Sequence, residues 1–340
     1  MKSVQLKDIA KAASVSPSTV SRVVRSNGYV SAAKQQAVQA AMMSLGYIRN
    51  EVKPTITEST MPLIGLLTLG AQNGLMFARM ADSLNQAAQA QGYLIVNVDI
   101  SGDLSAKHIT DVVNKLMSLH VSGIIFGSLG DLVDFMSIRK FIVNIPIPLV
   151  MIERVPDIYG LNKVLVNSKE GLFIAVKHLI GHGHWRILYM AIDHPQNEVE
   201  SSRLAGFQAA TSAMNCEDSA IYFPCPPKQY PDGRKSFIDF LAQNEMPTAI
   251  IASDMLLVGI LKYLYEQGIR IPKDISIVGV NDDLSRFSAP ALTSLAFPEK
   301  EIAENAVSII HLAQDGNAIP KTILLSPQLI ERDSIAEPRE

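Results

Sequence analysis

From residue 62 onward, short apolar runs of strand length alternate with longer segments in which apolar residues recur at helical spacing. The runs that predict strands are residues 63–69, 93–98, 123–126, 148–152, 163–166, 186–192, 220–223, 249–252 and 275–280. The segments that predict helices are residues 76–91, 104–119, 169–181, 203–214 and 255–267, and residues 294–326 add a strand, a helix at 300–313 and another strand. Repeated strand–helix units predict parallel sheets with crossover helices, here as two doubly wound subdomains. Ligands of such sheets bind at the carboxyl ends of the strands.

The first fifty residues have a different pattern, which predicts three short helices. Leu6, Ile9 and Ala13 recur at helical spacing. Ser16 is a good N-cap and Pro17 suits the first position of a second helix, while Ser31 caps a third. Two helices joined by a tight turn are typical of helix-turn-helix DNA-binding domains. The pattern alone leaves open a small helical bundle that binds protein.

The distribution of charge favours DNA. The whole chain carries 30 basic and 33 acidic residues, a net charge of −3, which on its own argues against a nucleic-acid partner. Residues 1–50, however, contain seven basic residues and one acid, a net of +6, which leaves −9 on the remainder. A basic head on an acidic body is expected when one domain alone contacts a polyanion.

Composition narrows the class of protein. Hydrophobic residues make up 48% and charged residues 19%, which is typical of globular proteins and excludes disordered, collagen-like and coiled-coil chains. Neither a run of 18 apolar residues nor a signal peptide is found, so we expect a cytoplasmic protein with no membrane partner. Cys216 and Cys225 are too few for a disulfide framework and are expected to be reduced thiols.

Several motifs in the head carry a resemblance to a known family. They are Leu-Lys-Asp-Ile-Ala at 6–10, Val-Ser at 15–16, Ser-Thr-Val-Ser-Arg-Val at 18–23, Gly-Tyr-Val-Ser at 28–31 and Leu-Gly-Tyr-Ile-Arg-Asn at 45–50. With this spacing the head resembles that of the LacI/GalR family of bacterial transcriptional repressors, and the resemblance continues through the body. It implies a fold class of an N-terminal three-helix helix-turn-helix domain plus an α/β periplasmic-binding-protein-like core of two doubly wound parallel-sheet subdomains.

The resemblance also implies the domain organisation. The head is expected at 1–50, a hinge or linker at 51–62, and an effector-binding and dimerisation core at 63–340. The chain is expected to cross between two lobes near 160, 290 and 326. The first lobe is then about 63–160 and 292–326, and the second about 161–291 and 327–340.

The second helix of the head is expected to enter the major groove with its N-terminus first. By the resemblance, Pro17 and Ser18 occupy the variable specificity positions, and the Arg22 fork suits guanine O6 and N7. Hydroxyls beside the helix N-terminus suit phosphates. In the hinge Ile56 matches an apolar minor-groove wedge, although Pro54 departs from the family pattern. For each helix residue the alternative is a solvated face. The expected DNA contacts are Ser16, Pro17, Ser18, Thr19, Ser21, Arg22, Tyr29 and Ile56.

A second set of residues is expected to bind a small effector in the cleft between the lobes. Arg154, Arg203, Asp254 and Asn281 match ligand-contact motifs of the family at strand or helix ends. Bidentate Arg and Asp side chains suit vicinal hydroxyls, so a sugar is the expected class. The site is completed by an aromatic wall and by a polar residue after the first strand, Phe287 and Asn73.

Two alternatives for this site remain. Strand-end charges can pair with one another across the cleft instead of contacting a ligand. A nucleoside or a sugar phosphate also fits, because two arginines can serve a phosphate. The segment 70–77 lacks the aspartate and paired aromatics usual in the family, which leaves the first lobe with fewer expected contacts.

Taken together, these features predict a sequence-specific DNA-binding repressor, a homodimer on operator DNA, whose affinity is gated by the effector through lobe orientation. An enzyme is not expected, because GxGxxG and GxxxxGK[ST] motifs and a catalytic triad are missing. His178, His182 and His184 span a helix end and turn, so they are interpreted as structural and no metal or cofactor is expected. A sugar-binding protein without a DNA function is disfavoured by the basic head.

Overall fold

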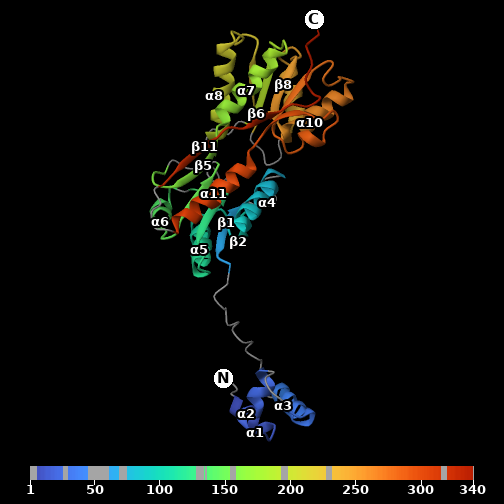
Figure 1. The fold of residues 1–340 in the computed structure, drawn as a ribbon. Coiled ribbons are helices and arrows are strands. Elements are labelled where there is room, and N and C mark those ends of the chain that lie inside the picture. The colour runs from blue at the N-terminus through green and yellow to red at the C-terminus, as the bar shows by residue number, and fades with distance from the viewer. Residues whose placement is uncertain are drawn as a thin grey trace. The chain divides into compact units, whose positions relative to one another are not determined.

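The computed structural model describes residues 6–25, 30–44, 61–68, 75–127, 134, 136–153, 158–192, 198–226, 232–314 and 320–339. The chain separates into two compact units, residues 1–60 and 61–340, and Figure 1 labels many of their helices and strands. None of the helices in these ranges is long and apolar enough to cross a membrane.

The head contains three helices, as the pattern predicts. They are α1 (Leu6–Ala12), α2 (Pro17–Arg25) and α3 (Ala32–Ser44). The Ser16 Oγ accepts a hydrogen bond from the Thr19 backbone N–H at 3.2 Å, so Ser16 is the N-cap that starts α2. Ile9, Val20 and Val38, one from each helix, are fully buried against one another. This small core fixes α2 with its polar face outward.

The first lobe of the core is built on a six-stranded sheet. Its strands, in the order β11-β5-β4-β3-β1-β2, are all parallel. They are β1 (Leu63–Thr68), β2 (Leu94–Asp99), β3 (Gly123–Gly127), β4 (Leu149–Ile152), β5 (Asn162–Val166) and β11 (Thr322–Leu325). Alternate residues of β3 enter different cores: Ile124 and Phe126 pack with α5 (Ala106–Ser118) and α6 (Arg139–Val143), while Ile125 packs with α4 (Leu75–Ala90) and α11 (Glu299–Ala313).

The second lobe is built in the same way, from a six-stranded sheet with a helix-lined core on each face. Its strand order is β12-β10-β9-β8-β6-β7, with only β12 antiparallel among the described pairs. The strands are β6 (Ile187–Ile192), β7 (Ile221–Cys225), β8 (Ala249–Ser253), β9 (Ser276–Asn281), β10 (Thr293–Ala296) and β12 (Gln328–Ile330). One core includes residues of α7 (Ser168–Gly181) and α8 (Glu198–Ala213), and the other of α9 (Gly233–Leu241) and α10 (Asp254–Glu266).

The chain passes between the two sheets three times, as expected, but two of the crossings lie elsewhere. β5, expected in the second lobe, pairs with β4 in the first sheet. β10, expected in the first lobe, pairs with β9 in the second sheet. The predicted lobe boundaries near 160 and 292 are therefore wrong by one strand each, because an apolar run does not specify the sheet that it joins. The third crossing lies between β11 and β12, where it was predicted.

Helices α7 and α8 approach each other closely at a glycine. A Cβ atom added to Gly206 of α8 would lie 2.0 Å from the backbone oxygen of Lys169 in α7. Such an overlap requires the helices to separate, so this glycine sets the position of α8 and of the side chains that α8 carries, Arg203 among them.

Replacing Gly206 by alanine is therefore expected to lower the free energy of unfolding by about 1–3 kcal/mol, a typical cost of overpacking. Urea unfolding followed by circular dichroism measures it. The matched control is Gly181→Ala at the end of α7, where an added Cβ meets no atom within 4 Å. Equal stability of the two variants would contradict the close helix contact.

Candidate functional site

The residues predicted to contact DNA come together on α2. Ser16, Pro17, Ser18 and Arg22 are exposed, whereas Thr19 and Ser21 are half-buried. The Ser16 Oγ lies 2.8 Å from the Ser18 Oγ and 2.9 Å from the Thr19 Oγ1, so these hydroxyls form one cluster at the helix N-terminus. The other two predicted contacts, Tyr29 and Ile56, lie outside the described residues.

Basic side chains surround this helix. Lys7 and Lys11 of α1 and Lys34 of α3 are exposed, as is Arg22 of α2. A helix N-terminus with unpaired amide groups and nearby cations favours phosphate oxygens. The exposed face of α2 therefore has the chemistry of a DNA-contacting helix.

In the core, Arg203 and Asn281 meet directly, as two of the predicted effector residues. The Arg203 Nη2 donates to the Asn281 Oδ1 at 2.9 Å, which links α8 to the carboxyl end of β9. Arg203 is 7% exposed, and its Nη1 donates to the Glu200 Oε1 at 2.5 Å. Burial lowers the pKa of the Arg203 guanidinium, but the combined effects of Glu200, Tyr189 and Glu153 outweigh burial and raise that pKa. Arg203 is thus a buried cation whose charge is compensated by Glu200.

Glu200 is a site residue that sequence reasoning missed. The Tyr189 Oη donates to the Glu200 Oε2 at 2.9 Å, and burial raises the pKa of the tyrosine well above its ordinary value. Glu200 stands three residues before Arg203 on the same helix, a spacing that places two side chains on one face. This spacing is the feature of the sequence from which Glu200 could have been predicted.

Asp254 opens α10 directly after β8, and its carboxylate holds the loop after β9. The Oδ2 accepts hydrogen bonds from the backbone N–H groups of Leu284 and Ser285, at 2.6 and 2.9 Å. The Oδ1 accepts from the Ser285 Oγ at 2.7 Å. Asp254 is 2% exposed. These bonds give it a structural role, and its contact with an effector stays a prediction.

The remaining predicted effector residues are separated from this cluster. Phe287 lies on a short 3-10 helix, η2 (Ser285–Phe287), and is 74% exposed, so it is not packed into the set around Arg203. Arg154 and Asn73 lie outside the described residues. Glu153, the neighbour of Arg154, is buried and accepts a hydrogen bond from the Val166 backbone N–H at 2.8 Å.

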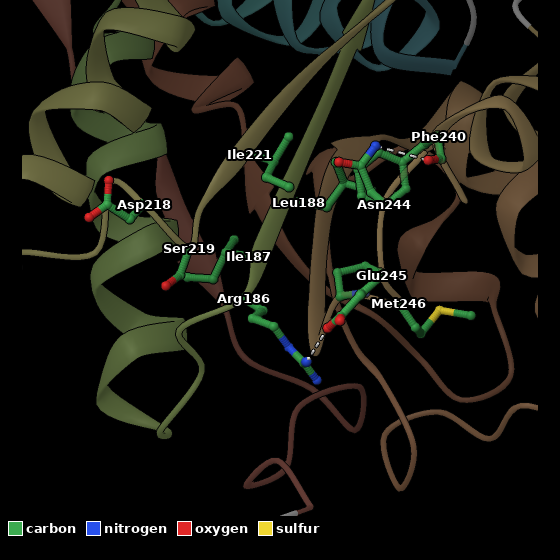
Figure 2. A pocket seen from close by; sticks show the side chains of 11 residues that line it. Arg186, Ile187, Leu188, Asp218, Ser219, Ile221, Phe240, Asn244, Glu245 and Met246 are labelled. Carbon is green, nitrogen blue, oxygen red and sulfur yellow. Dashed lines mark hydrogen bonds and ion pairs between the residues drawn. The ribbon is translucent and has the colours of Figure 1, made fainter. Parts of the chain in front are cut away.

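Two cavities lie in different parts of the core. One, of about 310 Å³, borders the first chain crossing and the start of α8, and its lining includes Glu153, Ser168, Glu198 and Ser202. Another, of about 260 Å³, lies at the amino ends of β6 and β7, where Arg186 pairs with Glu245 (Figure 2). The first lies at the carboxyl ends of β5 and β11, where ligands of parallel sheets bind, whereas Arg203 itself lines a separate cavity of about 10 Å³ together with Val166 and Val280.

The three histidines make contacts that suit a structural role. The His184 Nε2 lies 2.8 Å from the backbone oxygen of Ala336, which holds the C-terminal segment against the second lobe. The His182 Nδ1 lies 2.9 Å from the backbone oxygen of His178. Burial lowers the pKa of both His178 and His184, which favours their neutral forms.

Both the head and the core of this chain are similar to known proteins. Residues 5–50 match the family of bacterial regulatory proteins called the lacI family, and residues 176–335 match the periplasmic binding protein-like domain. The chain is 29% identical over 333 residues to the ribose operon repressor of Haemophilus influenzae, covering 97% of this chain and 98% of that protein. It is 28% identical over 334 residues to the transcriptional repressor PurR of Aliivibrio salmonicida, with the same coverage.

Solved structures of transcriptional regulators are also similar to this chain over nearly its whole length. The lac repressor dimer bound to operator and the anti-inducer ONPF superposes with a TM-score of 0.68 at 26% identity, over 98% of this chain and all of that one. The fold is shared by the complex of the regulator CelR with cellobiose, with a TM-score of 0.67 at 23% identity, over 97% of this chain and 99% of that one. The chain therefore has a lacI-type helix-turn-helix head and a periplasmic-binding-protein-like core, and the relatives that match it over almost its whole length are transcriptional repressors.

Proposed function

We propose that this chain is a lacI-family repressor that binds operator DNA as a homodimer through α2, and that an uncharged sugar in the cleft between the lobes sets its affinity for that DNA. The observation that carries the proposal is the pairing of Arg203 with Asn281 at the carboxyl end of β9, the sheet edge at which such folds bind ligands. The protein acts by binding rather than by catalysis, and a repressor of this kind works in the cytoplasm with the chromosome.

Recognition of DNA is assigned to the exposed face of α2. Pro17 and Ser18 at its start face bases, and Arg22 one turn later reads a guanine, while the Ser16, Thr19 and Ser21 hydroxyls bind phosphates. The exposure of Arg22 and the N-cap formed by Ser16 support this arrangement. Tyr29 and Ile56 are proposed as further contacts by their place in the family motifs.

The DNA assignment is tested by a gel shift of the full chain on its own promoter region. Arg22→Ala is expected to weaken specific binding by about 1–3 kcal/mol, because a bidentate contact to guanine is lost. Gln36→Ala, at an exposed position of α3, serves as the control and is expected to bind like the wild type. Failure of the wild type to shift any promoter fragment at low salt would overturn the repressor assignment.

A homodimer is supported by the lac repressor dimer among the similar structures and by an apolar surface on the second lobe. Met255 and Val258, one turn apart on α10, are 46% and 52% exposed, and Phe287 is 74% exposed. The bonds from Asp254 to residues 284 and 285 hold the Phe287 segment beside the start of α10. We assign Phe287 to this dimer surface rather than to the wall of the effector site.

The charges around the cleft support an uncharged effector over a phosphate. Arg203 is already neutralised by Glu200, and Glu153 lies close enough to act on it electrostatically. Glu153 and Glu198 line the adjacent cavity. A phosphate entering here would meet carboxylates, whereas sugar hydroxyls can donate to them and accept from Arg203. A lacI-family regulator with bound ribose and the CelR–cellobiose complex are among the similar folds.

A thermal-shift screen of the full chain tests the effector class. An uncharged pentose or hexose at about 100 times its Kd is expected to raise Tm by roughly 5 °C, whereas its phosphate has little effect. Glu200→Gln removes the charge that neutralises Arg203 and is expected to gain a response to the phosphate, with Glu304→Gln, at an exposed position of α11, as the control. A nucleoside or sugar phosphate that stabilises the wild type more than any uncharged sugar would favour the alternative effector class.

A further inference from the structure

One arginine joins the two lobes at the cleft. Arg79 belongs to α4 of the first lobe, and its guanidinium reaches the segment that follows β9 in the second lobe. The Nη2 donates to the Asn281 backbone oxygen and the Nη1 to the Asp282 backbone oxygen, both at 3.1 Å. The same guanidinium lies 3.1 Å from the Asp283 carboxylate. The planar fork of arginine thereby binds three consecutive residues of the other lobe.

The first lobe also holds this arginine in place. Glu299 begins α11, and its Oε1 accepts from the Arg79 Nη2 at 2.6 Å and from the Nε at 2.9 Å. Helix α11 packs beside α4 in the core of the first lobe. Arg79 is thus oriented by its own lobe before it contacts the other, which limits the conformational entropy that the contact costs.

The segment that Arg79 binds, residues 281–283, includes two residues with an unfavourable backbone conformation. Asn281 and Asp282 both have left-handed φ angles, 93° and 54°, which non-glycine residues adopt at a cost. Hydrogen bonds from Arg79 to the carbonyl oxygens of these two residues stabilise that conformation. The conformation in turn presents the Asn281 side chain to Arg203.

The acidic side chains of Asp283 and Glu299 also require the positive charge of Arg79. Asp283 is 8% exposed, and burial raises its pKa to about 6 although Arg79 opposes the shift. Asp254 and Glu299 raise the same pKa further through charge repulsion. Without Arg79, the charged forms of Asp283 and Glu299 would lose the cation that lies between them, and the lobes would repel each other at this point.

We propose that Arg79 is the positioning residue that fixes the orientation of the two lobes, by binding the strand end that also holds Arg203 through Asn281. This inference rests on the proposed effector gating and deepens it: a ligand that moves Arg203 or Asn281 changes the backbone to which Arg79 is bound. Lobe orientation and occupancy of the cleft are then linked through one guanidinium.

The test measures lobe orientation directly, without effector or DNA. Cysteines introduced at Lys115 of α5 and Gln208 of α8, both exposed, carry spin labels, and the full chain is diluted with unlabelled chain so that distances within one subunit dominate. Cys216 and Cys225 are buried, and a sample without added cysteines measures any labelling of them. The readout is the distribution of label–label distances from pulsed electron resonance.

Arg79→Ala is expected to broaden that distribution roughly twofold or to shift its mean, because lobe orientations that were minor become populated. Arg286→Ala is the matched control: Arg286 binds the Asp282 carboxylate at 2.6 Å from within the second lobe, so its loss is expected to leave the distribution unchanged. If Arg79→Ala does not fold, Arg79→Lys decides, since an ammonium cannot reproduce the planar fork and is expected to broaden the distribution too.

An unchanged distribution in the folded Arg79 variant, or equal broadening in the Arg286 variant, would overturn the inference. Neither result depends on which effector binds or on binding to operator. Failure here is therefore distinguishable from failure of the gel shift or of the sugar screen, which test the proposed function itself.

Discussion

Compensation of charge at the carboxyl end of β9 is the constraint on which the proposed effector site depends. Residues 281–283 bind four arginines of the described chain: Arg203 at the Asn281 side chain, Arg79 at two carbonyls and Asp283, and Arg286 and Arg332 at Asp282. Asp282 is 1% exposed, and its ion pairs with Arg286 and Arg332 offset the cost of burying its carboxylate. Arg79 comes from the first lobe and the other three arginines from the second. The residues at this strand end therefore connect the two lobes.

This arrangement gives a physical basis for gating. Each lobe is a sheet covered by helices on both faces, and packed layers of this kind move as rigid bodies rather than deform. Movement is then confined to the three crossings and to the polar contacts between the lobes. A ligand that prefers one arrangement of those contacts shifts the lobe orientation by its difference in affinity for the two states.

Much of the fold could be predicted from local pattern, and the failures have a common cause. The Ser16–Pro17 start of α2 and the buried strands follow from capping and apolar runs, which depend on neighbouring residues. The assignment of β5 and β10 to the wrong lobes arose because strand composition does not report strand pairing. Glu200 could have been found from its spacing to Arg203. Arg79 could not, because its partner Glu299 is 220 residues away in sequence.

The most direct test of the central claim is a double-mutant cycle on the free energy of unfolding of the full chain, with Arg79→Ala, Arg203→Ala and the double variant. The two arginines act on the same segment without pairing with each other. Arg203 binds the Asn281 side chain, and Arg79 binds the backbone oxygens of Asn281 and Asp282 and the Asp283 carboxylate. Coupling through that strand end predicts an interaction free energy of about 1 kcal/mol, measured by urea unfolding. Additivity within roughly 0.3 kcal/mol would contradict the account, since independent sites behave in that way.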